Sequence, residues 1–371
     1  MLKRVYIDNF RTFVNFELLL GQQQLILGLN GSGKSTLLEV LRAIKKLVTG
    51  DAQPDLLFPE SSRTRWQTLT QQTFELDVDL GESYRFRLEV DSPGSPALRR
   101  IRRELVTCGA QTVFEFVEGE VHLFDDRSEQ KEPKVRYPFN PFRSALATIQ
   151  PRSDNTKLMQ FKNWIETLYC LQLNPHSMSG QTAREESEPA FDMSNFASWY
   201  RHMIQEQAGA ASKLQDQLRE IIPGFDALNI SSFGPNLRSL EVDLAVTLSP
   251  LTTIPFTFDE LSDGQRVLIC LYALQNFVVA GNACLFLDEP ENYIALAEIQ
   301  PWLMELRDRI EDCGGQVILI SHHPEIIDYL APELGLIFER VGVGPVRVRP
   351  YKPNESLSPS EQIARGWEDR G

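Results

Sequence analysis

Long hydrophobic runs, cysteines and basic residues are all scarce in this 371-residue sequence, and each shortage excludes a class of protein. No apolar run reaches the roughly 18 residues that a membrane-spanning helix needs, so no membrane role is expected. The five cysteines are widely spaced without a C-x-x-C pair, and the five histidines add no metal-ligand spacing. This pattern argues against structural zinc and disulfides and favours reduced, mostly buried thiols. The first residues, Met1-Leu2-Lys3-Arg4, do not resemble a signal peptide, so we expect a cytoplasmic protein.

Positive charge is in deficit, with 37 Lys and Arg against 51 Asp and Glu and a formal net charge of −14. Proteins that coat nucleic acid usually show the opposite balance. Any DNA contact must therefore come from a local patch, for which the candidates are Arg99, Arg100, Arg102 and Arg103, with Arg63 and Arg65 as further partners. The same run could equally be a charged edge strand that is protected from aggregation.

The sequence also lacks internal repeats and any sustained heptad, which excludes the long coiled-coil rod of a chromosome-organising ATPase. Alternating apolar residues predict a β-meander between Phe74 and Val117. The pattern becomes helical from about Asn140 to Phe225, where Leu158–Leu168 and Phe196–Ile222 are the clearest helices. After Gly264 helices and strands alternate, which implies a mainly parallel sheet covered on both faces.

These patterns predict an α/β protein with a discontinuous head, a helical insertion and a tail. We expect the head to comprise residues 1–139 and 236–350, with a mixed β lobe and a mainly parallel sheet flanked by helices. A compact helical insertion lobe would occupy residues 140–235, and residues 351–371 would form a polar, loosely ordered tail.

The most informative stretch is Gly28-Leu29-Asn30-Gly31-Ser32-Gly33-Lys34-Ser35-Thr36, between an apolar strand and an amphipathic helix. Strand, glycine-rich turn, Lys-Ser and helix is the arrangement of a phosphate-binding loop. Its glycines let backbone N–H groups turn inward, and the helix N-terminus favours an anion. Lys34 can reach the β- and γ-phosphates, and the Ser35 hydroxyl can bind Mg²⁺. The sequence therefore predicts that the chain binds a nucleoside triphosphate.

A second apolar strand, Leu285–Leu287, ends in two adjacent carboxylates, Asp288 and Glu289. Ligands bind at the carboxyl ends of strands in open α/β sheets. Asp288 would hold Mg²⁺ through its water shell, and Glu289 would orient or deprotonate the attacking water. The next predicted strand, Gln316–Ile320, is followed by Ser321 and His322, and the imidazole of His322 could contact a γ-phosphate.

The segment Leu261–Arg266 precedes a strongly apolar helix and has two interpretations. Ser262 or Asp263 could simply cap that helix. Alternatively, Ser262, Gly264 and Gln265 could form an anion site. Because Lys34 already serves the phosphates of its own chain, this second site makes sense only against the nucleotide of another subunit.

These motifs, in this order, resemble an ABC-type ATPase of the RecF/SMC/OLD branch. The matching segments are Asn9–Arg11, the Walker A loop Gly28–Thr36, the signature Leu261–Arg266, the Walker B segment Asp288–Asn292 and the switch histidine His322. The Asp-Glu-Pro-Glu-Asn run is similar to that of AAA-labelled ATPases in bacterial defence systems, such as Septu-like and retron-associated modules. Two positions depart from the pattern: Asp263 replaces a common glycine, and the usual D-loop Leu-Asp is absent around 294–296.

The resemblance implies a head-to-tail homodimer, or a higher oligomer, with two ATP molecules and Mg²⁺ held between the subunits. Nucleotide contacts would come from Arg11, Asn30, Gly31, Ser32, Gly33, Lys34, Ser35 and Thr36, and the magnesium ligands from Ser35, Asp288 and the Q-loop candidate Gln150. Glu289, His322 and Lys34 would be catalytic, and Ser262, Gly264 and Gln265 would act in trans.

The biological role has three alternatives. Only 49 residues follow His322, too few for the nuclease domain of OLD-type proteins, so a defence ATPase that regulates a separate effector is the first. A RecF-like DNA-repair ATPase is the second, supported by the arginine run. A nucleotide-gated scaffold that does not hydrolyse ATP is the third.

Overall fold

The computed structural model describes residues 1–92, 98–127, 132–245, 252–281, 283–353 and 357–365. Its backbone contacts divide the chain into two compact units. Unit 1 consists of Met1–Tyr169 and Leu336–Tyr351, and unit 2 of Cys170–Gly335 and Lys352–Gly371. The division at Tyr169 falls inside the segment 140–235 that the sequence predicted as one helical insertion.

Unit 1 is built on an eight-stranded antiparallel sheet in the order β2-β1-β4-β5-β6-β7-β8-β9. Its strands are β1 (Leu2–Asp8), β2 (Phe16–Leu19), β4 (Gln72–Asp79), β5 (Ser83–Asp91), β6 (Arg100–Cys108), β7 (Gln111–Val117), β8 (Glu120–Leu123) and β9 (Val135–Pro138). The sequence predicts a hairpin of Val5–Phe13 with Phe16–Leu20, which the antiparallel pairing of β1 with β2 confirms. The predicted meander is confirmed as well, because strands that follow one another from β4 to β9 are also neighbours in the sheet. Tight turns at Gly81, Gly109 and Gly119, all with positive φ, join these strands.

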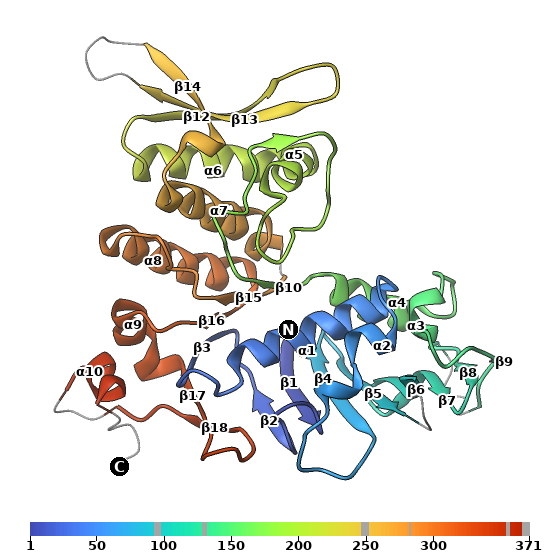
Figure 1. The fold of residues 1–371 in the computed structure, drawn as a ribbon. Coiled ribbons are helices and arrows are strands. Elements are labelled where there is room, and N and C mark those ends of the chain that lie inside the picture. Colours follow the sequence, from blue (N-terminus) through green and yellow to red (C-terminus); the bar gives the residue numbers. More distant parts are fainter. Residues whose placement is uncertain (93–97, 128–131, 246–251, 282, 354–356, 366–371) are drawn as a thin grey trace. The chain divides into compact units, whose positions relative to one another are not determined.

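The phosphate-loop part of unit 1 contains β3 (Gln23–Leu27), which lies beside β17 (Gly335–Glu339), and β17 pairs with β18 (Arg347–Pro350). The helices of this unit are α1 (Lys34–Thr49), α2 (Pro54–Leu57), η1 (Glu60–Ser62), α3 (Ala145–Thr148) and α4 (Thr156–Glu166). Helix α1 buries Leu37, Leu41, Ile44 and Val48 along one stripe. It ends at Gly50, which has a left-handed conformation, where a glycine in the sequence predicts the helix stop. Helices α1, α3 and α4 lie together on one side of the large sheet (Figure 1).

Unit 2 is a stack of helices joined to short sheets. The parallel strands β15 (Cys284–Asp288) and β16 (Gln316–Ile320) are fully buried, as expected of a sheet covered on both faces. The remaining strands are β10 (Leu168–Leu171), which spans the boundary between the units, β11 (Gln181–Thr182), β12 (Phe225–Ser232), β13 (Arg238–Ala245) and β14 (Thr253–Thr257). The helices are α5 (Phe196–Glu206), α6 (Ala208–Ile221), η2 (Phe258–Glu260), α7 (Asp263–Phe277), η3 (Val279–Gly281), α8 (Leu296–Cys313), α9 (Pro324–Leu334) and α10 (Pro359–Ala364). In Figure 1, α6 lies against the β12–β14 sheet and stacks on α7, which stacks on α8.

Three expectations about these elements are wrong in part. The predicted helix Phe196–Ile222 is two helices, because Gln207 leaves the helical conformation with φ −132° and ψ 57°. The segment predicted as helical also contributes strands β10 and β11 and the start of β12. The polar tail contains α10, whose Ser360 backbone N–H donates to Asp328 of α9 at 2.7 Å. The sequence also predicts a strand over Leu237–Leu248, of which residues 246–248 lie outside the described residues, as do parts of the tail.

No described helix is long and apolar enough to cross a bilayer.

Candidate functional site

The glycine-rich loop forms between β3 and α1, as the sequence predicted. Gly28, Gly31 and Gly33 have φ values of 143°, 79° and 104°, in the region that L-residues avoid. A Cβ atom on Gly28 would come within 2.3 Å of the Phe338 carbonyl oxygen, so β17 approaches too closely for any side chain. These three glycines therefore turn the loop back over the first turn of α1.

The lysine and a serine of this loop have the features of an anion site. The Lys34 side chain is almost buried, and its Nζ donates to the carbonyl oxygens of Gly28 at 2.6 Å and Leu29 at 3.2 Å. Ser32 Oγ is buried and has no hydrogen-bond partner among the described residues. Asn30, Gly31 and Ser35 are exposed, and Thr36 is half-buried. An ammonium group, an unsatisfied hydroxyl and a helix N-terminus on one loop fit a polyphosphate.

A cavity of about 620 Å³ lies entirely within unit 1, and its lining residues come from outside the loop itself. Its lining residues are Arg11, Thr12, Pro59, Ser61, Ser62, Arg63, Arg65, Trp66, Arg340 and Val343. It adjoins the phosphate loop because Thr12 bonds to Val346, and the ring of Phe13, next to Thr12, limits the space at Gly33.

The cavity combines four guanidinium groups with one large aromatic ring. Trp66 is 46% exposed, and Arg65 is exposed as well. Arg11 has a positive φ and donates to Glu39 of α1 at 2.6 Å. A planar aromatic surface beside several arginines suits an aromatic ligand that carries negative charge. From the sequence we predict a nucleotide contact for Arg11, but for Arg63 and Arg65 only a contact with DNA. No local sequence pattern shows that residues 11, 66 and 340 lie together in the fold.

The carboxylates that follow β15 lie in unit 2. Asp288 is the last residue of the strand and is 5% exposed. Glu289 has φ 49°, and its backbone N–H donates to the Ile320 carbonyl of β16 at 2.8 Å. Its Oε2 accepts from Asn292 Nδ2 at 2.9 Å. A non-glycine residue held at positive φ costs free energy and is characteristic of functional positions.

A buried carboxyl group, which the sequence reasoning did not single out, joins the ends of β15 and β16. Glu291 is 6% exposed, and its Oε1 accepts from Ser321 Oγ at 2.5 Å. Ser321 Oγ in turn accepts from the His323 backbone N–H at 3.0 Å. Burial raises the pKa of Glu291 and outweighs the hydrogen bond from Ser321, which lowers it. His322 is exposed at this strand end, and His323 caps α9 by accepting from the Glu325 backbone N–H.

The signature segment caps α7, so the simpler of its two interpretations is realised. Ser262 Oγ accepts from the Gln265 backbone N–H at 3.3 Å, and the Gln265 side chain returns to Ser262 in a capping box. Asp263 pairs with Arg266 at 2.7 Å, so its charge is compensated within its own helix. A Cβ on Gly264 would lie 2.7 Å from the Tyr293 carbonyl oxygen, which explains a glycine at this position. The trans contacts of Ser262, Gly264 and Gln265 stay a prediction.

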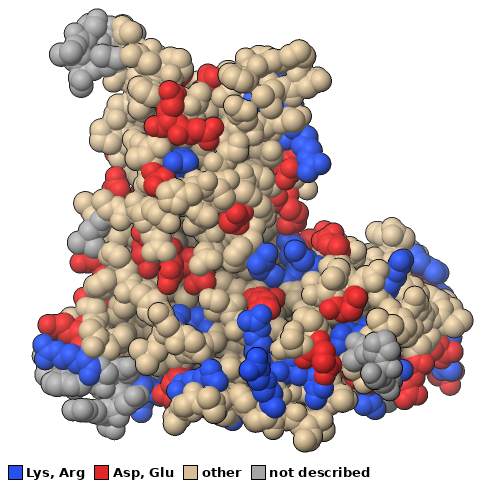
Figure 2. Space-filling model, in the orientation of Figure 1, with Lys and Arg blue, Asp and Glu red and all other residues tan. Residues whose placement is uncertain are grey.

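The predicted basic patch needs a correction, because Arg99 is 2% exposed and its guanidinium bonds inside the protein. Arg100 pairs with Asp91 and Arg103 with Glu115, whereas exposed Arg102 has the neutral partner Gln71. Figure 2 shows basic and acidic side chains interspersed on the face drawn, without a large field of one sign.

The Q-loop candidate Gln150 lies one residue beyond the C-cap of α3. It is exposed, and its backbone carbonyl accepts from Asn155 Nδ2 at 3.0 Å. Its role in magnesium binding stays a prediction.

Comparisons with known proteins agree with this architecture. A family model described as "AAA domain, putative AbiEii toxin, Type IV TA system" matches residues 25–328. No curated protein matches the chain. The chain is similar to a solved Smc head bound to the C-winged helix domain of ScpA, with 12% identity and a TM-score of 0.55 over 96% of this chain and 99% of that one. It is also similar to the SMC head domain from Thermotoga maritima, with 11% identity and a TM-score of 0.49 over 95% of this chain and 99% of that one.

The likeness to the ScpA-bound head shows the fold, and the family match covers most of the chain. The chain therefore has the SMC head fold and belongs to the AAA-domain family that this model describes.

Proposed function

We propose that the protein is a Mg²⁺-dependent ATPase that dimerises head-to-tail on ATP and regulates a separate effector in bacterial defence. The observation that carries the proposal is the preformed phosphate loop, with a nearly buried Lys34 and an unsatisfied Ser32 hydroxyl. A positively charged loop at a helix N-terminus has little use other than binding a phosphate chain.

The phosphates would lie on the backbone N–H groups of residues 30–36, with Lys34 at the β- and γ-phosphates. Ser35 and Asp288, with Gln150, would hold Mg²⁺, which when bound neutralises charge on the β- and γ-phosphate oxygens. Glu289 would orient and deprotonate water, and His322 would contact the γ-phosphate. The strained backbone of Glu289 supports this role, since such strain accumulates where a side chain must be aimed.

The base and ribose would occupy the cavity beside the loop. A volume of about 620 Å³ is ample for a nucleoside, and Trp66 offers a ring on which a base can stack. Arg11 and Arg63 lie at the cavity wall, where their planar guanidinium groups are held by Glu39 and Glu60 and can lie against a base.

The second subunit would supply Ser262, Gly264 and Gln265 at the start of α7. Their side chains and backbone lie at a helix N-terminus, and Asp263 is neutralised by Arg266, which removes an obstacle to an approaching phosphate. Because each nucleotide would bridge two chains, ATP binding closes the dimer and hydrolysis opens it. The toxin–antitoxin description of the family supports a role in defence through an effector.

A RecF-like DNA-binding ATPase is the second candidate. Arg102 favours it, because this side chain is exposed and contacts no carboxylate in the described residues. Phosphate contacts would make the affinity for DNA fall steeply between about 50 and 200 mM salt.

The central experiment measures ATP hydrolysis per chain at increasing protein concentration, for the wild type and Glu289→Gln. We expect the wild-type rate per chain to rise with concentration and the variant to lose about 10²-fold or more of it. Light scattering with saturating Mg·ATP should show a stable Glu289→Gln dimer. A monomeric variant, together with a wild-type rate that is independent of concentration, would contradict the proposal. If Glu289→Gln leaves the biological activity intact, the protein is instead a nucleotide-gated scaffold.

A further inference from the structure

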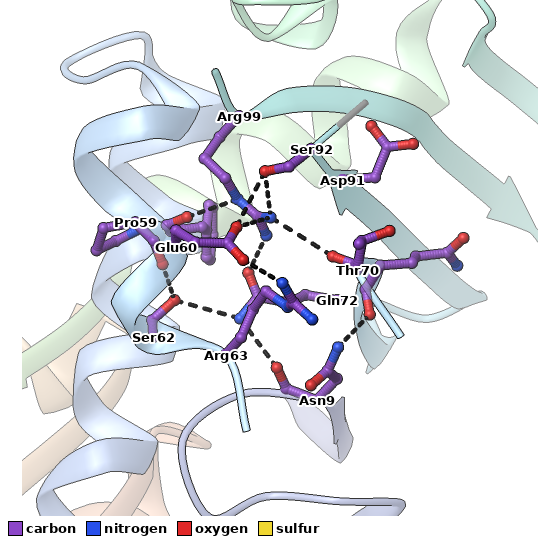
Figure 3. Close-up of polar contacts among 12 residues, drawn as sticks. Asn9, Pro59, Glu60, Ser62, Arg63, Thr70, Gln72, Asp91, Ser92 and Arg99 are labelled. Atoms are coloured by element: carbon purple, nitrogen blue, oxygen red, sulfur yellow. Dashed lines mark hydrogen bonds and ion pairs between the residues drawn. The ribbon is translucent and has the colours of Figure 1, made fainter. Parts of the chain in front are cut away.

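Arg99 is a buried arginine whose polar contacts, drawn in Figure 3, include the chain segment that lines the cavity of about 620 Å³. Its Nε donates to the Phe58 carbonyl at 2.8 Å, and its Nη1 donates to Ser92 Oγ at 2.9 Å and Glu60 Oε2 at 3.3 Å. Its Nη2 donates to Gln72 Oε1. Arg99 itself does not line the cavity.

The segment that Arg99 holds supplies most of the cavity wall. Phe58 and Glu60 alternate along the chain with Pro59 and Ser61, which face the cavity, and Ser62, Arg63, Arg65 and Trp66 follow. Because Arg99 binds a backbone carbonyl and a side chain of the same segment, it fixes both the path and the orientation of this wall.

Glu60 connects Arg99 to a residue of the cavity. One of its carboxylate oxygens accepts from Arg99 and Ser92, and the other accepts from Arg63 Nη1. Burial alone would raise the pKa of Glu60, but hydrogen bonds from Arg63 and Ser92 and the charges of both arginines outweigh it and lower the pKa. The carboxylate therefore stays ionised, and it orients Arg63 toward its place in the cavity wall.

A second anchor fixes the far end of the same segment. Asn9, at φ 60°, accepts from the Thr64 backbone N–H at 3.2 Å and donates to the carbonyls of Leu69 and Gln71 at 2.8 and 2.7 Å. Arg63 Nη2 also donates to the Leu69 carbonyl at 2.8 Å. Arg99 therefore contacts the segment at residues 58 and 60, and Asn9 contacts it at residues 64, 69 and 71, on the two sides of Arg63.

We propose that Arg99 is a positioning residue that preorganises the cavity for the base and ribose of ATP. The proposal rests on the proposed function, since it needs the nucleoside in this cavity. A preorganised wall avoids the entropy loss of ordering a loop when the ligand binds. Burying a guanidinium is costly unless it is paired, and a purely structural need could be met by apolar packing. A fully satisfied arginine beside a ligand cavity is therefore consistent with a requirement for defined geometry.

The test compares the affinity for two probes, ATP and inorganic tripolyphosphate, in the wild type, Arg99→Met and Arg102→Met. Tripolyphosphate would engage the phosphate loop alone, whereas ATP would also need the cavity. We expect Arg99→Met to weaken ATP binding about tenfold, roughly the loss of one good contact, and to leave tripolyphosphate binding within about twofold. Arg102→Met, three residues further along the chain on β6 and exposed, should change neither affinity. Arg99→Lys should recover part of the ATP affinity by keeping one donor for Glu60 or Phe58.

The outcomes separate the inference from the function on which it rests. A wild type that binds neither probe contradicts the proposed function. If the wild type binds ATP no better than tripolyphosphate, the nucleoside does not contribute to binding in the cavity, and the inference about Arg99 is contradicted. Equal weakening of both probes in Arg99→Met, or no weakening, overturns the positioning role alone. If Arg99→Met does not fold, Ser92→Ala removes one partner of both Arg99 and Glu60, and it should give the same selective loss at about two- to threefold.

Discussion

One buried carboxyl group of unit 1, Glu104, has a raised pKa that makes the stability of this unit depend on pH. Glu104 of β6 is completely buried, and it accepts from Ser144 Oγ at 2.7 Å and from the Leu146 backbone N–H at 3.1 Å. Burial raises its pKa to about 7, against the opposing effect of these hydrogen bonds and of the Lys162 charge. The folded protein therefore holds a proton on Glu104 at pH values where the unfolded chain has released it.

The sign of the pH dependence follows from this raised pKa. Stability from Glu104 is fully present below its ordinary pKa near 4.5 and is lost as pH rises through about 7. The loss is at most about 3.5 kcal/mol, from roughly 1.4 kcal/mol for each of the 2.5 units between 4.5 and about 7. Glu104→Gln should flatten the fall in denaturation midpoint between pH 5 and 8, because the amide cannot ionise. The control Glu220→Gln, on the exposed face of α6, should keep the wild-type slope, and an unchanged slope in Glu104→Gln would show that another group is responsible.

At the level of elements, the close contact between α7 and the loop after β15 makes Gly264 a sensitive position. A Cβ there meets the Tyr293 carbonyl oxygen at 2.7 Å, and Tyr293 itself is held at φ 76°. Gly264→Ala should therefore displace this loop and lower ATPase activity by more than about tenfold, even though alanine favours helix. Gly209→Ala, at an open position in α6, should leave activity unchanged and alter stability by less than about 1 kcal/mol. Equal ATPase activity of Gly264→Ala and Gly209→Ala would show that the close contact between Gly264 and the Tyr293 carbonyl is not needed for hydrolysis.

The elements that were predictable from sequence are those whose signal is local. The phosphate loop with α1, and the buried strands β15 and β16, follow from glycine spacing and continuous apolar runs, and their bounds agree closely with the expectation. The break at Gln207 was missed because the apolar period continues across it, from α5 into α6. Tertiary contacts outweigh such local patterns.

The residues that were not predictable depend on contacts between distant segments. Arg99 was grouped with the surface arginines that follow it, yet its partners are Phe58, Glu60, Gln72 and Ser92 on other elements. The cavity likewise joins positions near 11, 63 and 340, which no sequence window contains. Glu291 is two residues from the acidic pair Asp288-Glu289 in the sequence, but the sequence does not show that its side chain is buried and accepts a hydrogen bond from Ser321.

At the scale of the whole molecule, the net charge of −14 opposes nucleic-acid binding. We expect only weak binding to duplex DNA at 50 mM salt, with no difference between the wild type and the double variant Arg102→Glu, Arg103→Glu. Fluorescence anisotropy of a labelled duplex measures this directly. A steep salt dependence that the double variant abolishes would instead favour the RecF-like alternative.

The head-to-tail arrangement makes a prediction that no single-chain enzyme shares. If each site takes Lys34 from one chain and Ser262 from the other, Lys34→Ala and Ser262→Phe should each be inactive alone. In a mixed dimer one of the two sites is intact, because the Ser262→Phe chain contributes Lys34 and the Lys34→Ala chain contributes Ser262. Random pairing of equal amounts gives half mixed dimers, so mixing should restore about one quarter of wild-type activity. The loss of the α7 cap in Ser262→Phe costs about 1 kcal/mol, and thermal unfolding checks that this variant stays folded. Activity of the mixture that equals the sum of the separate variants would mean that each chain carries a complete catalytic site.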